Sequence, residues 1–155
     1  MSKYWLVKSE PSTYSFSDLK RDGHTVWEGV RNFQARNFMK EMKLSDLVLF
    51  YHSNCDDKGV FGLAKVVREA YPDPSAQNPK SDYYDERSLK NPNFWLVVDL
   101  AWAQDFQRSI SLAEMKEVVA LHDMRLVRKG NRLSVLPVEK AEFDCITKMG
   151  LLTLP

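Results

Sequence analysis

Apolar residues in this chain are spaced at two different periods. Short segments rich in β-branched and aromatic residues and bounded by turn residues are typical of strands. They predict strands at 4–8, 47–51, 59–67, 94–103 and 133–136. The second of these is apolar throughout, so both of its faces are expected to be buried. Gly62 inside the third indicates a bulge or the close approach of another element.

Other segments show helical spacing next to residues that suit a helix terminus. The segment 33–43 places its apolar residues on one face, namely Ala35, Phe38, Met39 and Met42. Further helices are predicted from Ser15 or Ser17 to about Arg21, from Ser111 to about Val118, and from Pro137 to Gly150. Serine can cap the first two of these, and proline suits the first turn of the last.

The stretch 71–92 shows neither period and contains four of the seven prolines. A loop of about 20 residues is uncommon in a compact domain unless it has a task such as covering a site. Two tyrosines within it, in Asp82-Tyr83-Tyr84-Asp85, give the loop an aromatic anchor of its own.

Irregular spacing between five or six strands, with short helices among them, predicts an α+β fold. A small curled sheet or open barrel fits this pattern better than a doubly wound parallel sheet, which would need regular strand–helix alternation. At 155 residues the chain is expected to form a single domain over 1–155.

The composition is that of an ordinary globular protein, with 44% hydrophobic and 28% charged residues. No apolar run approaches the roughly 20 residues of a membrane span, and the start lacks the apolar region of a signal peptide. We therefore expect a cytoplasmic protein with no membrane partner. The isolated Cys55 and Cys145 argue against a disulfide scaffold or a zinc site.

The net charge is +1, from 22 Lys and Arg against 21 Asp and Glu. This balance excludes a protein that coats DNA through phosphate contacts alone. Two local groups depart from the average: the cluster Arg125, Arg128, Lys129 and Arg132, and the helical stripe Arg36, Lys40 and Lys43. Each can touch a short stretch of nucleic-acid backbone or simply be a solvated face, and the stripe is expected to belong to the surface.

The densest candidate chemistry lies between Val26 and Ser53. A core needs apolar residues at a regular period, whereas this stretch sets forked donors and amides beside aromatic rings. Such groups suit a planar, hydrogen-bonding ligand such as a nucleobase. The candidates are Trp27, Arg31, Asn32, Tyr51, His52 and Ser53. A core role for the tryptophan and a hydrogen-bonded strand end for the last three remain open.

Polar groups at two other strand ends extend this candidate site. Lys8 and Ser9 end the first strand, while Arg132 and Ser134 accompany the last one. Lys8 can donate to a base carbonyl while Glu10 accepts from an exocyclic amine, although a surface salt bridge explains the same pair. Arg132 and Ser134 can approach the same mouth and bind a phosphate or a base edge.

Enzyme signatures are few in this sequence. His24, His52 and His122 lack metal-ligand spacing, and neither a Gly-x-Ser-x-Gly motif nor a phosphate loop is present. Lys8 with Glu10 is the one pair that could transfer a proton. We expect no metal, no cofactor and no catalytic residue, and binding is favoured over catalysis.

Four motifs in order resemble those of the EVE domain family. They are residues 4–11 (YWLVKSEP), 27–37 (WEGVRNFQARN), 50–53 (FYHS) and 128–135 (RKGNRLSV). The resemblance covers the chain from Tyr4 to about Gly150. One departure is Leu44-Ser45-Asp46, because the family often has glycine before the aspartate; it affects a turn.

This resemblance implies a PUA-like pseudobarrel of about five to six mostly antiparallel strands with peripheral short helices. It also implies a pocket that reads a modified base, usually a modified cytosine in DNA, with a modified base in RNA as a second possibility. The pocket or rim residues that it implies are Lys8, Ser9, Trp27, Arg31, Asn32, Tyr51, His52, Ser53, Arg132 and Ser134. A bacterial cytoplasmic protein is the corresponding expectation.

Two alternatives stay open at this point. The related ASCH branch of PUA-like folds includes an amidohydrolase that acts on acylated cytidine, and Lys8 with Glu10 could support such a hydrolysis. A further possibility is a targeting subunit that binds a modified base on behalf of a partner nuclease.

Overall fold

A computed structural model describes residues 3–151 of the chain. Within this range, six strands form one sheet in the order β2-β5-β4-β3-β1-β6. The strands are β1 (Tyr4–Ser9), β2 (His24–Trp27), β3 (Leu47–His52), β4 (Gly59–Pro72), β5 (Leu96–Ser111) and β6 (Val135–Val138). Neighbouring strands run antiparallel, except that β1 and β3 are parallel. The α+β fold with six mostly antiparallel strands is therefore confirmed.

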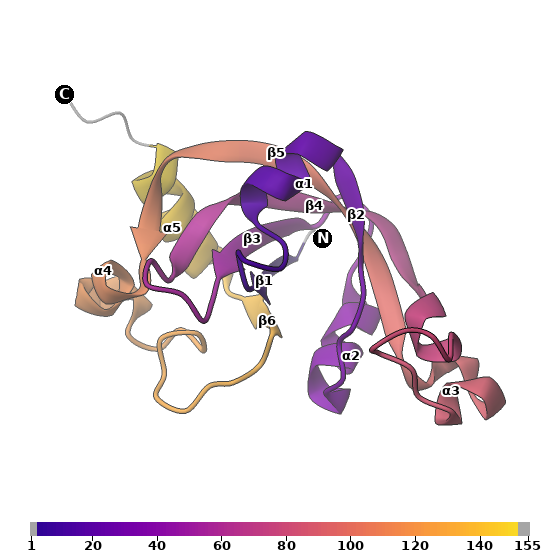
Figure 1. The fold of residues 1–155 in the computed structure, drawn as a ribbon. Helices are drawn as coiled ribbons and strands as arrows, with labels where there is room; N and C mark the ends of the chain where they lie inside the picture. The colour runs from indigo at the N-terminus through magenta and orange to yellow at the C-terminus, as the bar shows by residue number, and fades with distance from the viewer. Residues whose placement is uncertain (1–2, 152–155) are drawn as a thin grey trace.

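Short helices surround this sheet. They are α1 (Phe16–Asp22), α2 (Phe33–Glu41), α3 (Arg87–Lys90), α4 (Leu112–Glu117) and α5 (Lys140–Leu151), with 3₁₀ turns η1 (Pro74–Gln77), η2 (Pro92–Phe94) and η3 (Val119–Leu121). The long strands β4 and β5 arch across the molecule, with α4 and α5 at one end and α2 and α3 at the other (Figure 1). No helix among residues 3–151 has the length and apolar character needed to cross a membrane.

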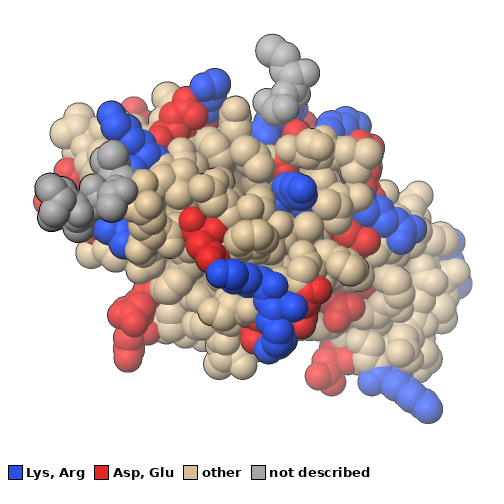
Figure 2. Space-filling model, turned by 90° about the horizontal axis from the view of Figure 1, so that it is seen from above, with Lys and Arg blue, Asp and Glu red and all other residues tan. Residues whose placement is uncertain are grey.

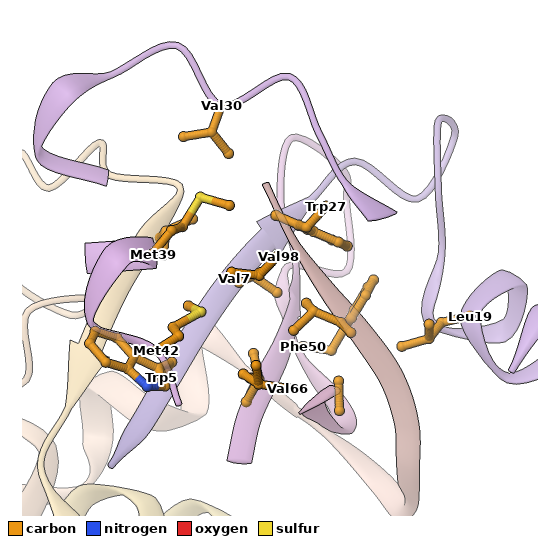
Figure 3. Close-up of a cluster of buried hydrophobic side chains, with 14 of the residues drawn as sticks. Trp5, Val7, Leu19, Trp27, Val30, Met39, Met42, Phe50, Val66 and Val98 are labelled. Carbon is orange, nitrogen blue, oxygen red and sulfur yellow. The ribbon is translucent and has the colours of Figure 1, made fainter. Parts of the chain in front are cut away.

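The sheet has a hydrophobic cluster on each face. Along β3, Phe50 belongs to the first cluster, whereas Leu49 and Tyr51 belong to the second. This alternation explains why the segment is apolar at every position: both faces are covered. Figure 3 shows the first cluster, in which Trp27 and Phe50 lie among side chains from several elements.

Local chemistry sets several of the boundaries. Ser15 caps α1 with a reciprocal capping box, and Gly23 ends the helix in a positive-φ conformation. Ser111 accepts from the backbone N–H of Glu114 and so begins α4. At Gly62 the β4 ladder is irregular and the Phe16 ring packs directly on the backbone, as the glycine indicated.

Several elements differ from the sequence-based expectation. Pro137 lies within β6 and not in the last helix, which begins at Lys140. Because β6 is an edge strand that pairs with β1 alone, the missing proline N–H costs no ladder bond there. The expected strands at 59–67 and 94–103 are longer than predicted, and β2 was not expected at all.

Candidate functional site

A cavity of about 600 Å³ opens beside the end of β1, and we call it the main cavity. Residues from four separate segments line it: Lys8, Ser9, Glu10, Thr13 and Tyr14; Thr25 to Arg31; Tyr83; and Ser134. Lys8, Ser9 and Ser134 from the two predicted strand ends therefore meet the first part of the Val26–Ser53 stretch at one place, whereas Arg132 does not line this cavity.

Backbone hydrogen bonds fix the β1 side of the main cavity. The amide of Lys8 donates to the carbonyl of Ser134 over 2.9 Å, which brings the segment before β6 against the end of β1. The Ser9 hydroxyl donates to the carbonyl of Tyr14 over 2.6 Å and holds the turn that follows β1. The Ser9 donor is thus committed to the fold.

The Lys8 ammonium is the cation of the main cavity that the fold leaves unpaired. Its side chain is half-buried, and among residues 3–151 it forms no ion pair. Its Nζ lies 6.0 Å from the centre of the Tyr51 ring. Burial lowers the pKa of Lys8 below its ordinary value. A desolvated ammonium without a carboxylate partner is suited to donate to a carbonyl or anionic group of a ligand.

Trp27 has a place in both the core and the main cavity. Its ring meets that of Phe50 edge-on, with centroids 5.5 Å apart and planes at 82°. It is 9% exposed and also lines the cavity. Trp27 is therefore a core residue, and its position at the cavity also allows a contact with a ligand.

The buried carboxylate of Asp73 holds the segment after Trp27 in position. Asp73 is 0% exposed and accepts from the Gly29 amide over 3.3 Å and from the Arg31 guanidinium over 3.0 Å. The same guanidinium donates to the carbonyl of Tyr83 over 2.7 Å. Arg31 therefore braces the cavity wall with most of its donor capacity.

Tyr83 forms the outer part of this wall and is 40% exposed. Its ring packs so closely on Gly29 that a Cβ added to this glycine would lie 2.7 Å from Tyr83 Cζ. Gly29 also has φ +80°, a conformation that glycine adopts at little cost. The long stretch 71–92 thus contributes the Tyr83 side chain to the lining of the main cavity.

Three predicted residues from the end of β3 lie outside the lining of the main cavity: Tyr51, His52 and Ser53. Tyr51 packs in the second cluster, where burial raises its pKa to about 12. The His52 ring stacks on Phe61 at 4.0 Å, and its Nε2 accepts the Phe16 amide over 3.0 Å. Burial lowers the pKa of His52, in keeping with a neutral acceptor.

Asn32 and Arg132 line a second cavity of about 530 Å³. We call it the basic groove, and its lining is Asn32, Gln34, Arg125, Arg128, Lys129, Gly130, Asn131, Arg132 and Leu133. The Asn32 side chain caps α2 by accepting from the Ala35 amide over 2.9 Å. The two cavities are neighbours, because Arg31 and Ser134 line one while Asn32 and Leu133 line the other.

Several residues of the site were not predicted from the sequence. Tyr14, Thr25 and Glu28 line the main cavity, and Asp73 organises its wall. The tyrosine pair in the proline-rich loop was the available signal for Tyr83. In the described part of the chain, no three His, Cys, Asp or Glu side chains are grouped so that they could hold a metal ion.

Comparison with known proteins gives close relatives over nearly the whole chain. The EVE domain family model matches residues 3–149. Mouse thymocyte nuclear protein 1 is 39% identical over 168 residues, which cover 96% of this chain and 74% of the relative.

Solved structures agree with this assignment. Human THYN1 protein, crystallised in complex with 5-methylcytosine-containing DNA, is 38% identical with a TM-score of 0.91, over 99% of this chain and 100% of that one. A crystal structure of a Pseudomonas putida protein is 44% identical with a TM-score of 0.91, over 96% and 99% of the two chains. This chain belongs to the EVE domain family.

Proposed function

We propose that this protein is a reader of modified cytosine in nucleic acid and that the base is held in the main cavity. One pairing of observations carries the proposal. The human relative with the same fold was crystallised with 5-methylcytosine-containing DNA. This chain has, where three of its four motifs meet, a cavity of about 600 Å³, a size that accepts a nucleobase.

The lining of the main cavity supplies complementary groups for cytosine. The base packs against the aromatic residues Tyr14, Trp27 and Tyr83. The Lys8 ammonium donates to the cytosine carbonyl, and a carboxylate, Glu10 or Glu28, accepts from its exocyclic amine. A base inside a duplex must first leave the stack at a cost of a few kcal/mol, so single-stranded or mismatched targets bind more tightly than paired ones.

Magnitudes limit how well a methyl group can be selected. Burying one methyl contributes about 0.8 kcal/mol, which is roughly a fourfold preference. A hydroxymethyl group whose hydroxyl pairs with a buried polar atom gives larger discrimination. We therefore expect 5-methylcytosine to be preferred to cytosine severalfold and a polar modification to be preferred more strongly.

Lys8→Met tests the cavity because it keeps the length of the side chain and removes the charged donor. Losing a hydrogen bond from a charged group costs about 1.5 kcal/mol, or roughly tenfold in affinity. The measurement is fluorescence anisotropy with matched single-stranded oligonucleotides that carry cytosine, 5-methylcytosine or 5-hydroxymethylcytosine. Lys65→Met, at an exposed position of β4, is the matched control and should bind like wild type.

Two results would contradict the reader proposal. The first is that Lys8→Met binds the three oligonucleotides with the affinities of the wild type. The second is that the wild type binds all three oligonucleotides with equal affinity. A second assay tests the amidohydrolase alternative: the protein is incubated with acylated cytidine, and the deacylated product is followed by mass spectrometry. Turnover that is lost in Lys8→Met would favour the amidohydrolase instead.

A further inference from the structure

The basic groove carries four cationic side chains without an ion-pair partner, one of which, Arg125, lies over the Phe38 ring at 5.5 Å from its centre. Across the part of the chain that the structure describes, none of them forms an ion pair within 4 Å or donates a side-chain hydrogen bond: Arg125, Arg128, Lys129 and Arg132. All four residues are exposed. By contrast, Arg31 pairs with Asp73 and Arg108 with Glu114.

The loop that presents these cations is well anchored. Met124 and Leu126 are buried in the second hydrophobic cluster. The Asn131 side-chain amide donates to the Arg125 carbonyl over 2.7 Å, and its oxygen accepts the Leu133 amide over 2.9 Å. Gly130 turns the chain with φ +84°. Little backbone entropy is therefore lost when an anion binds among the four cations, and the ordering cost falls on their exposed side chains.

This concentration of one charge sign is local. The face seen from above in Figure 2 mixes Lys and Arg with Asp and Glu, in keeping with the net charge of +1. Asp123, Glu139 and Glu142 line a smaller hollow together with Arg125 and Arg128. Lys129 and Arg132 line the basic groove but not that hollow. Substituting these two residues therefore changes the charge of the groove without changing the lining of the smaller hollow.

The position of the groove identifies its ligand. It adjoins the main cavity at two peptide bonds, Arg31–Asn32 and Leu133–Ser134. Phosphates follow one another along a DNA strand at about 3.4 Å of helix axis. A strand whose base occupies the main cavity can therefore place its neighbouring phosphates along the groove.

We propose that the basic groove binds the phosphodiester backbone beside the base held in the main cavity, so that the ligand is a nucleic-acid strand and not a free nucleoside. The identity of that base rests on the proposed function. The backbone contact is independent of sequence and of modification, because phosphate contacts position a strand while base contacts specify it.

The double variant Lys129→Ala/Arg132→Ala tests the groove. Both side chains are exposed and without partners in the described structure, so the fold should be unchanged. Lys40→Ala/Lys43→Ala removes the same charge from exposed positions that line neither cavity and serves as the control. Fluorescence anisotropy with a labelled single-stranded 5-methylcytosine oligonucleotide is measured from low to high NaCl, and calorimetry follows the free nucleoside 5-methyl-2′-deoxycytidine.

The groove variant should lose about tenfold in oligonucleotide affinity at low salt. Removing two phosphate contacts should reduce the slope of log K against log salt by about 1.4 for a single strand. Affinity for the free nucleoside should stay at the wild-type value, and the control should keep both affinities. The RNA version of the oligonucleotide, titrated in parallel, shows which backbone the groove prefers, and a loss with either supports the proposal.

An unchanged salt slope in the groove variant, or an equal loss in the control, would overturn the proposal even if methylated oligonucleotides were still preferred. A loss confined to the groove variant supports the groove even if methylated and unmodified strands bind alike. Equal binding of methylated and unmodified strands would contradict only the proposal that the main cavity reads a modified base. Absence of any oligonucleotide binding by wild type would overturn both.

Discussion

The main cavity and the basic groove adjoin one another but are built differently. In the main cavity Arg31 is committed to Asp73 and the Tyr83 carbonyl, and the Ser9 hydroxyl to the Tyr14 carbonyl. In the groove four cations project from an anchored loop without ion-pair partners among the described residues. Internal hydrogen bonds and ion pairs give the main cavity a fixed shape. The basic groove has few such bonds, so its charges are available to a ligand. Shape provides selectivity between bases, whereas free charge provides affinity for any strand.

Replacing Trp27 should have the largest effect, because it belongs to both the core and the main cavity. Trp27→Ala should lower the free energy of unfolding by about 3–5 kcal/mol, the usual cost of deleting a buried tryptophan. Urea denaturation measures this loss. Trp27→Phe retains much of the packing against Phe50, so the folded variant should keep salt-dependent strand binding while losing the preference for the modified base. Wild-type selectivity in Trp27→Phe would show that the tryptophan does not contact the base.

Two glycines with nearly the same positive φ give a smaller and better matched test. Gly29→Ala and Gly130→Ala both place a side chain at positive φ, at about 1 kcal/mol each. At Gly130 nothing lies within 4 Å of the added Cβ, whereas at Gly29 the Tyr83 ring must move. Only Gly29→Ala should weaken modified-base binding, by severalfold in anisotropy titrations. An equal effect of the two variants on binding would remove the distinction between cavity and groove.

His52 should have the smallest effect on binding, because it lines neither cavity and belongs to the scaffold, where it pairs with Ser9 in the sheet. Its folded pKa lies below the unfolded value of about 6.5. Its contribution to stability is therefore complete above about pH 6.5 and is lost as the pH falls through the folded pKa, by up to about 1.4 kcal/mol per pH unit. His52→Gln retains an acceptor for the Phe16 amide without titrating. Urea denaturation curves at pH 7.5 and 5.5 should differ less for this variant than for wild type.

Local signals made much of the fold predictable. Ser15, Gly23 and Ser111 act through hydrogen bonds within a few residues of themselves, so the sequence alone reveals them. Pro137 suits a helix start as well as an edge strand, and only the position of β6 at the sheet edge decides between these. The four residues of β2 form an edge strand too short for a periodicity to be read.

The candidate site was predictable where residues stand at strand ends, as Lys8 and Ser134 do. It was not predictable at Tyr51 and His52, because an uninterrupted apolar run does not reveal which alternate residues face which side. Tyr83 and Asp73 reach the wall through tertiary contacts across more than 40 residues, and no local pattern encodes these.

The place of β1 between β3 and β6 has a consequence for synthesis. Tyr4 pairs with Leu47 on one side and with Val138 on the other, so this early strand obtains its second neighbour only when most of the chain has left the ribosome. Until then one edge of β1 is available for pairing with other chains, a known route to aggregation. Ser134 is positioned in the same late step, so a nascent chain completes the lining of its main cavity at the moment when its exposed strand edge is covered.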